Sequence, residues 1–314
     1  MSSVETFPYI WANDAPAEPD ALPALFREQH LEIKKILLDT GAILFKSFGI
    51  DSPAKLQRCI EAFPGNPVNY VGGNSPRTNL EGKVYTSTEQ AAHAHISLHN
   101  ELSYAHTWPR YIFFCCEKPA EEGGFTIIAD SRRILSDLPA SVSGSFRGKG
   151  VSYIRNLHGG AGAGPSWQGT FETEQPENVE HFCRENDIRF EWKDRKKLRL
   201  TENRAAVIRH PETGEEVWFN QADQFHPSTN EPEVYEALME LYEDDPKEMP
   251  QYVCFNDGSD IPLEMLDQIR AAGDKNTVYF TWEKGDLLLL DNILTAHGRT
   301  PYKGSRSILV AMLS

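Results

Sequence analysis

The 314-residue sequence has no run of about 18 apolar residues, the minimum for a membrane-spanning helix. Its first residues lack the basic start and apolar stretch of a secretory signal, so we expect a cytoplasmic protein. Positive charge is scarce, because the sequence has 31 Lys and Arg against 46 Asp and Glu, which gives a formal net charge of −15. Nucleic acid and anionic membranes both need a cationic face, and we therefore expect neither as a partner.

The sequence is also poor in cysteine patterns. Its five cysteines are odd in number and form no C-x-x-C pair, so we expect neither a disulfide framework nor structural zinc. Cys115 and Cys116, inside "YIFFCC", are interpreted as small residues of a buried strand. The glycine-rich stretch "NLHGGAGAGPSW" (156–167) lacks the strand-GxGxxG-helix context of a nucleotide site, and we expect a loop near a ligand there.

What is present is ordinary globular composition, 40% hydrophobic and 25% charged, with no internal repeat. Apolar spacing and turn residues predict helices and strands in different parts of the chain. The expected helices cover 21–41, 51–65, 231–245 and 261–273, and the expected strands 42–48, 95–102, 110–116, 124–130, 285–292 and 306–313. Strands at both ends with a helical, loop-rich middle predict a mainly β core carrying α-helical insertions. The pattern differs from the βαβ alternation of a doubly wound sheet.

Two distant segments carry the reactive side chains. In "HISLHNELSY" (95–104), His99 and Glu101 are two residues apart, and on an extended segment they face the same side. His297, in "DNILTAHGRTPYKGSR" (291–306), supplies a third ligand. Two histidines and one carboxylate form the face that holds Fe(II) and leaves positions open for O₂. A zinc hydrolase and a non-catalytic binding module remain alternatives, although zinc hydrolases usually carry His-Glu-x-x-His on one helix, which is absent here.

Several motifs in the same order resemble one enzyme family. They are "SPRTNL" (75–80), "SLHNELSY" (97–104), "PAEEGGFTIIADSR" (119–132), "YIRN" (153–156), "WFNQADQFH" (218–226) and the stretch 285–312. Together they resemble the iron- and 2-oxoglutarate-dependent oxygenases of the taurine dioxygenase and clavaminate synthase superfamily, closest to the syringomycin-pathway aspartyl hydroxylase-like branch. The resemblance implies a double-stranded β-helix, or jelly roll. We expect one oxygenase domain over 1–314, with insertions at roughly 155–275 forming a lid and flanking helices.

By that resemblance, His99, Glu101 and His297 bind iron, and 2-oxoglutarate and O₂ are the cosubstrates. The far carboxylate of 2-oxoglutarate would meet Arg306 and Thr126, because a buried dianion needs a planar bidentate cation. Arg299 is the competing arginine, but two residues from His297 it would hardly reach the far end of the diacid. The sequence departs from the family in Phe125, which follows Gly123-Gly124 where relatives commonly have Glu. Because Glu101 supplies a carboxylate, a halogenase is not expected.

The resemblance further implies hydroxylation of an unactivated C–H bond in an amino-acid-like substrate, within peptide natural-product metabolism. Ring closure or desaturation with the same cofactors remains open, since the outcome depends on radical geometry. Substrate contacts are expected from positions that recur in relatives: Arg77, Arg155, Trp167, Asn220 and Gln221.

Other histidines and one basic run stay outside this site. His93 and His95 would share a face with His99 if the strand extended that far, yet the glycine and glutamate spacing of a cupin is missing, and we expect them at the pocket rim. His226 is expected to be packed in the interior. The basic run Lys193–Arg199 is either a solvated face or a dock for an acidic carrier protein bearing a tethered substrate.

Overall fold

A computed structural model describes residues 7–13, 18, 20–68, 78–88, 90–193, 196–243 and 245–314. Its largest sheet has seven strands in the order β1-β2-β16-β6-β19-β4-β3, with only β1 and β2 parallel. Their bounds are Tyr9–Ala12, Ala42–Lys46, Leu287–Asp291, Tyr111–Lys118, Ser307–Leu313, Val84–Thr86 and Asn79–Glu81. Strands from the two ends of the chain thus lie side by side, as the sequence predicts.

This sheet is buried on both faces, which explains the continuous apolar run in β16. Alternate residues of a strand point to opposite faces. Leu287 and Leu289 pack in a cluster with helices α1–α3, whereas Leu288 and Leu290 pack in the interior with Ile128 of the facing sheet. The covering helices are α1 (Ala21–Glu28), α2 (His30–Thr40) and α3 (Pro53–Ala62).

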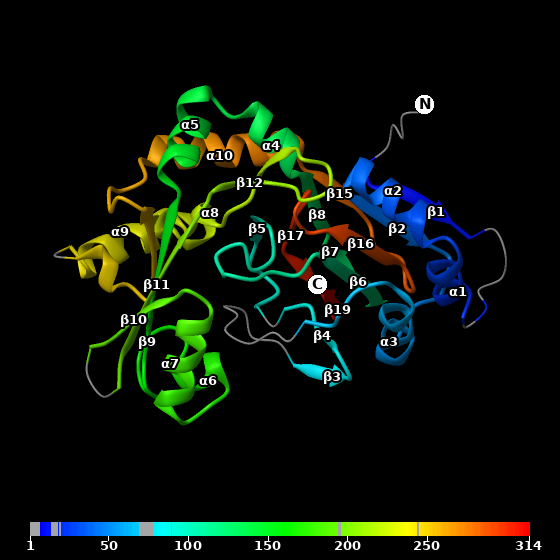
Figure 1. Cartoon of the computed structure of the whole chain (residues 1–314), viewed down its shortest axis with the longest axis horizontal. Coiled ribbons are helices and arrows are strands. Elements are labelled where there is room, and N and C mark those ends of the chain that lie inside the picture. Colours follow the sequence, from blue (N-terminus) through cyan, green and yellow to red (C-terminus); the bar gives the residue numbers. More distant parts are fainter. Residues whose placement is uncertain are drawn as a thin grey trace.

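The facing sheet has four strands in the order β15-β8-β17-β5. Their bounds are Val278–Phe280, Thr126–Asp130, Thr295–Arg299 and Ile96–His99. With the large sheet it forms the two-layered β-helix, so the expected jelly-roll core is confirmed. Helices α4 (Ser131–Asp137), α5 (Ala140–Lys149) and α10 (Leu263–Asn276) lie on its outer side, seen at the top of Figure 1.

The middle of the chain departs from the prediction of helices and loops, because it contains a sheet of its own. Strands β10-β11-β9-β14 pair in an antiparallel array beside the jelly roll, in green to brown-gold at the left of Figure 1. Their bounds are Arg189–Trp192, Leu198–Arg204, Val151–Leu157 and Gln251–Phe255. A hairpin, β12 (Val207–Arg209) with β13 (Glu216–Trp218), follows this sheet in the chain. The remaining elements are β7 (Glu122–Gly123), β18 (Tyr302–Lys303), α6 (Trp167–Phe171), α7 (Pro176–Glu185), α8 (Ala222–Phe225), α9 (Pro232–Leu241), η1 (Pro227–Thr229) and η2 (Pro246–Glu248).

The helices match their predicted positions with one correction. The segment 21–41 forms two helices, α1 and α2, which are separated at Gln29, where φ is −120° and ψ is 24°. Gly41 ends α2 in the left-handed region at φ +82°, as predicted, and a Cβ there would meet the Thr295 hydroxyl at 2.5 Å. Among the described residues, no helix is both long and apolar enough to cross a bilayer.

Candidate active site

His99 and His297 are cross-strand neighbours. Antiparallel pairing of β5 with β17 sets them directly opposite one another, with ring centroids 4.4 Å apart. The pairing then slips by one residue, because Arg299 pairs with Ile96, and this bulge places Ile96 and His99 in the wall of the same cavity. Gly298 makes the bulge possible, since a Cβ there would lie 2.4 Å from the Ile96 carbonyl oxygen.

Glu101 lies in the turn after β5 and is fixed by Asn292, which belongs to the turn between β16 and β17. Asn292 Oδ1 accepts a hydrogen bond from the Glu101 backbone N–H at 2.7 Å, and its Nδ2 donates to the Glu101 carbonyl at 3.0 Å and to the Pro109 carbonyl at 2.9 Å. Asn100 donates in turn to the Asn292 carbonyl at 2.6 Å. The turns that follow β5 and β16 are thereby joined at the backbone of Glu101.

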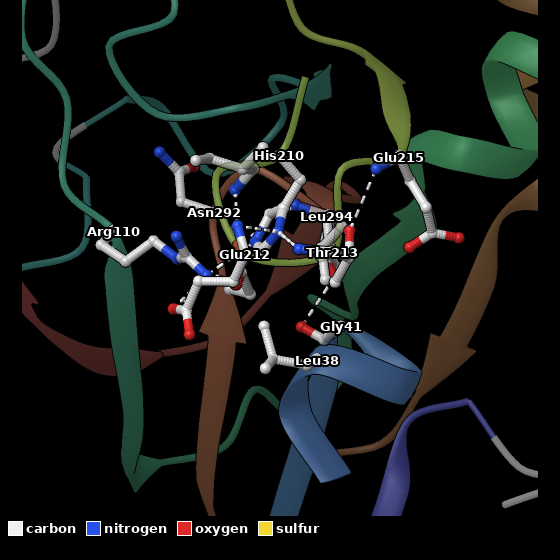
Figure 2. A network of polar contacts seen from close by, with 12 residues as sticks. Leu38, Gly41, Arg110, His210, Glu212, Thr213, Glu215, Asn292 and Leu294 are labelled. Carbon is white, nitrogen blue, oxygen red and sulfur yellow. Dashed lines mark hydrogen bonds and ion pairs between the residues drawn. The ribbon is translucent and has the colours of Figure 1, made fainter. Parts of the chain in front are cut away.

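The turn that carries Asn292 is itself anchored by buried charges, shown in Figure 2. Asp291 accepts from the Ile293 and Leu294 backbone N–H groups, and Arg110 forms an ion pair with it at 2.9 Å. His210, from the β12–β13 hairpin, places Nε2 at 3.1 Å from the same carboxylate. His210 Nδ1 accepts from the Thr213 N–H, and Nε2 also lies 2.6 Å from Arg110 Nη2, so His210, Arg110 and Asp291 form one buried polar cluster.

The three candidate ligands fit a metal ion. One ligand atom from each of His99, Glu101 and His297 lies within 4.8 Å of the others, and His297 Nε2 is 3.7 Å from Glu101 Oε2. His99 Nδ1 lies 2.9 Å from the Ser97 carbonyl, which can only accept, so Nδ1 carries the proton and the Nε2 lone pair remains for a metal. His297 Nδ1 is buried without a hydrogen-bond partner in the described part of the chain. Neutral imidazoles with a carboxylate suit Fe(II).

A small cavity of about 50 Å³ extends from the histidines toward Thr126 and Arg306. Arg306 donates to the Gly124 carbonyl at 3.1 Å and lies 3.4 Å from Thr126 Oγ1, which also accepts from Trp282 at 2.9 Å. No carboxylate of the described residues pairs with Arg306. Burial and the nearby charge of Arg299 lower the pKa of Arg306 to about 10, and no carboxylate of the described residues offsets them.

Arg299, the competing arginine, is committed elsewhere. Its guanidinium donates to the backbone carbonyls of Gln90, Ala91 and Ala94, and thereby holds the segment that precedes β5. Arg299 also lines the small cavity, and its Nε is buried without a hydrogen-bond partner in the described part of the chain.

A larger cavity of about 350 Å³ opens on the other side of His99 and Glu101. Gln221, Gln224 and Gln251 of the middle segment form one wall, and the segment before β5 forms the other. A neighbouring cavity of about 370 Å³ lies between β5 and α10, and Gln221 and Ser97 line both this cavity and the one of about 350 Å³.

The family described as "Taurine catabolism dioxygenase TauD, TfdA family" matches residues 12–312. The chain belongs to this family. It is an Fe(II)- and 2-oxoglutarate-dependent dioxygenase, and the expectation from the sequence motifs is confirmed.

Two relatives cover most of this dioxygenase. The dapdiamide synthesis protein DdaC of Enterobacter agglomerans is 37% identical over 284 residues, which span 90% of this chain and 85% of DdaC. A clavaminate synthase-like protein of Arabidopsis thaliana is 25% identical over 324 aligned positions, spanning 98% of this chain and 94% of that protein.

Solved structures agree on the fold. PvcB of Pseudomonas aeruginosa superposes with a TM-score of 0.55 at 14% identity, covering 97% of this chain and 84% of PvcB. AAD-2, solved in complex with Mn(II) and N-oxalylglycine, gives a TM-score of 0.55 at 11% identity, covering 97% and 93%. At such low identity the likeness supports the jelly roll and nothing finer.

Some of the expected substrate residues of the dioxygenase line the cavities near the histidines, and others do not. Asn220 and Gln221 line the cavities, but Asn220 already joins the Ala206 carbonyl and the Ala222 N–H. Arg155 and Trp167 are not among the described residues that line the three cavities near the histidines, and their role at the substrate stays a prediction. Arg155 is buried in an ion pair with Glu202 at 2.8 Å, because it lies on β9 facing β11.

Trp167 packs at the far end of the middle sheet, with its ring edge-on to Trp192 at 5.5 Å. The glycine-rich loop before it, expected near a ligand, lies beside Lys197 and Tyr242 and lines neither cavity at the histidines. Arg77 lies outside the described residues.

The remaining expectations concern groups without a role at the metal. His95 is exposed at the rim of both larger cavities, as expected. His226 is packed, with Nδ1 accepting from the Ser228 N–H, and burial lowers its pKa to about 4. All five cysteines are buried and free, and burial raises the pKa of Cys116 to about 12.

Sequence reasoning missed the groups that position the ligands: Asn292, Asp291, His210 and Gln224. The run of leucines ending in Asp291-Asn292 was a usable signal, because two polar residues directly after a buried strand must satisfy buried backbone groups. No comparable signal marks His210, whose partner is 81 positions away.

Proposed function

We propose that His99, Glu101 and His297 hold the Fe(II) of this dioxygenase and that Arg306 and Thr126 bind the far carboxylate of 2-oxoglutarate. One observation carries the proposal: three ligand side chains, two histidines and a glutamate, from segments almost 200 positions apart meet within 4.8 Å, beside a guanidinium with no carboxylate partner in the described chain. A diacid in the small cavity would supply the missing negative charge, and bidentate pairing is the strongest contact that arginine offers a carboxylate.

The bound iron with 2-oxoglutarate and O₂ supplies the oxidant that removes hydrogen from an unactivated carbon, releasing succinate and CO₂. The protein's part is positional. Ser97 fixes the tautomer of His99, and Asn292 fixes the backbone that carries Glu101. Phe114 packs at 5.1 Å from the His297 ring and helps to exclude water from that side.

We further propose that the substrate is a small molecule derived from an amino acid and that the reaction is hydroxylation of a C–H bond in specialised metabolism. The support is the relative named for dapdiamide synthesis, at 37% identity over 90% of this chain. Residues 1–314 would act as one oxygenase domain. The segment 155–275 would form its lid and flanking helices, supported by the cavity wall that Gln221 and Gln251 contribute.

Carrier docking is a finer proposal, on the basic run Lys193–Arg199. Part of its charge is already neutralised, since Lys193 lies 3.2 Å from Glu191 and Arg199 pairs with Glu248. Lys196 and Lys197 lie in the same run and are the two lysines that the test reverses. Reversing both to Glu should lower turnover of a carrier-bound substrate and leave the same free amino acid unaffected. Equal turnover of the carrier-bound substrate by wild type and reversal would refute docking at this run.

The test of the metal site is an anaerobic titration with Fe(II) and 2-oxoglutarate, followed by the weak visible charge-transfer band and then by succinate release under O₂. His297→Gln should lose both the band and succinate formation. His226→Gln is the matched control, because His226 is equally buried but packed away from the cluster. A normal band in His297→Gln would end this assignment.

A further inference from the structure

The cavity of about 350 Å³ beside His99 and Glu101 is unusually rich in carboxamides and poor in cations. Its lining contains Gln90, Gln221, Gln224, Asn230 and Gln251, and no Lys or Arg occurs among the described residues of the wall. Apart from the proposed iron, an anionic group of a ligand would find no Lys or Arg counter-charge there. Glu101, proposed as a metal ligand, is the only carboxylate of this lining.

Three of these carboxamides are oriented by the protein in the same sense. Gln221 donates from Nε2 to the Asn100 carbonyl at 2.8 Å, and Gln224 donates from Nε2 to the Ser97 carbonyl at 3.2 Å. Asn230 donates from Nδ2 to the Pro227 carbonyl at 2.8 Å. Backbone carbonyls only accept, so each contact fixes the NH₂ end toward the protein.

The opposite ends of these side chains are acceptors. Gln221 Oε1, Gln224 Oε1 and Asn230 Oδ1 receive no hydrogen bond from the described part of the chain. Amide oxygens on a cavity wall without donors of their own are complementary to N–H groups and to an ammonium ion. Such a wall repels a free carboxylate of a ligand only weakly. However, it offers that carboxylate no hydrogen-bond donor, so the free energy of removing the carboxylate from water is not offset.

We propose that Gln221, Gln224 and Asn230 form a subsite for an amine or amide N–H of the substrate, and that the cavity selects ligands whose carboxyl group is not a free anion. This inference rests on the proposed function, since it concerns the substrate of the same metal site. It deepens that function by naming the chemistry at the contact: an N–H donor beside an acyl group masked as an amide or thioester.

The experiment uses matched sets built on one amino acid. Each set contains the amino amide, the N-acetyl amide, the free amino acid and the N-acetyl acid, and the N-acetylcysteamine thioester forms a separate arm that distinguishes the two masked forms. Binding to the enzyme loaded with Fe(II) and 2-oxoglutarate is followed without O₂ by calorimetry and by perturbation of the visible band. We expect the amino amide or thioester to bind at least tenfold more tightly than the N-acetyl acid.

Two pairs of variants separate charge from hydrogen bonding. Gln90 lines the same cavity, and its side chain forms no hydrogen bond to the described residues. Gln90→Lys should therefore weaken binding of the cationic amino amide about threefold, and Gln90→Glu should strengthen it. Neither variant should change the affinity for the neutral N-acetyl amide. Asn230→Leu should weaken the amino amide about tenfold, while Asn230→Asp, which keeps an acceptor oxygen, should not.

Equal or tighter binding of the N-acetyl acid by the wild type overturns the subsite. So does an Asn230→Leu variant that binds the amino amide as well as wild type. The two proposals fail differently: a visible band without ligand preference refutes the subsite alone, whereas calorimetric preference without a band refutes the assignment of the metal residues and supports the subsite.

Discussion

Replacing Asn292 by Ala should damage both the stability of the protein and the affinity of its metal site. The side chain is completely buried and makes three hydrogen bonds, to the backbone N–H and C=O of Glu101 and to the carbonyl of Pro109. Truncation leaves three buried polar groups unsatisfied, at about 1–3 kcal/mol each. Allowing for local relaxation, we expect the free energy of unfolding to fall by about 3–6 kcal/mol.

The effect on the metal follows from where the broken bonds lie. Two of the three hold the residue that carries the candidate carboxylate, so Glu101 should lose its fixed approach to His99 and His297. Groups that orient a metal ligand are worth about 10- to 100-fold in metal affinity. Urea unfolding of the metal-free protein measures the first effect, and an anaerobic Fe(II) titration of the folded variant measures the second.

Asn220→Ala is the matched control. Asn220 is also a buried carboxamide, and it joins two backbone groups, the Ala206 carbonyl and the Ala222 N–H, neither of which belongs to the turn of Glu101. It should cost about 2–4 kcal/mol of stability without changing metal affinity. If Asn292→Ala and Asn220→Ala bind Fe(II) equally well, Asn292 has no special role in positioning Glu101.

Three other perturbations follow from the same structure. Arg306→Lys should raise the KM for 2-oxoglutarate at least tenfold, because the bidentate pair with its carboxylate is lost. Arg299→Lys, which loosens only the segment before β5, should raise this KM less than threefold. Equal effects of the two variants in steady-state assays would contradict the assignment. His210→Phe should lower the free energy of unfolding in urea by about 2–4 kcal/mol, because the buried contacts of its ring nitrogens with Asp291 and with the Thr213 N–H are then lost, and a loss below 1 kcal/mol would show these contacts to be dispensable. Burial, aided by Arg270, lowers the pKa of His226 to about 4, so between about pH 6.5 and 4 the unfolded chain binds a proton that the folded chain does not bind. The free energy of unfolding should therefore fall by roughly 3 kcal/mol as the pH drops from about 6.5 to 4. His226→Gln should remove this pH dependence in urea titrations at several pH values.

The strands of the jelly roll and the triad were accessible from the sequence for physical reasons. A strand buried on both faces must be apolar at every position, and "LLLL" in β16 has no other use in a globular protein. His99 and His297 were recognised because a metal site demands particular side-chain types, and those types stand in motifs that resemble a family.

The structure differs from the sequence expectation where long-range contacts override local pattern. Simple alternation would place His95, Ser97 and His99 on one face, but β5 begins only at Ile96 and a bulge interrupts its register with β17. The break at Gln29 between α1 and α2 carries no Gly or Pro, so the helical periodicity runs through it in the sequence.

The sheet of the middle segment had a readable signal that was overlooked. In β11, Leu198, Leu200 and Glu202 are buried and alternate with more exposed residues, which is the period of a half-buried strand. The basic run that precedes β11 was interpreted by its charge, as a solvated face or a docking surface, and its strand pattern was not used. Arg155 illustrates the limit of such reasoning, because only the register of β9 with β11 reveals that its partner is Glu202 rather than a substrate.

A single segment of the middle region, 210–224, touches the candidate metal site at three points. His210 contacts Asp291 beside Asn292, Gln221 donates to the carbonyl of Asn100, and Gln224 Nε2 lies against both the Ser97 carbonyl and His99 Nδ1. The same segment supplies two side chains of the larger cavity. A substrate that displaces Gln221 or Gln224 therefore alters hydrogen bonds one residue from Glu101 or shared with His99. We therefore expect substrate choice and ligand geometry to be coupled in this chain, so that a graft of this segment from a relative retains iron only if it keeps all three contacts.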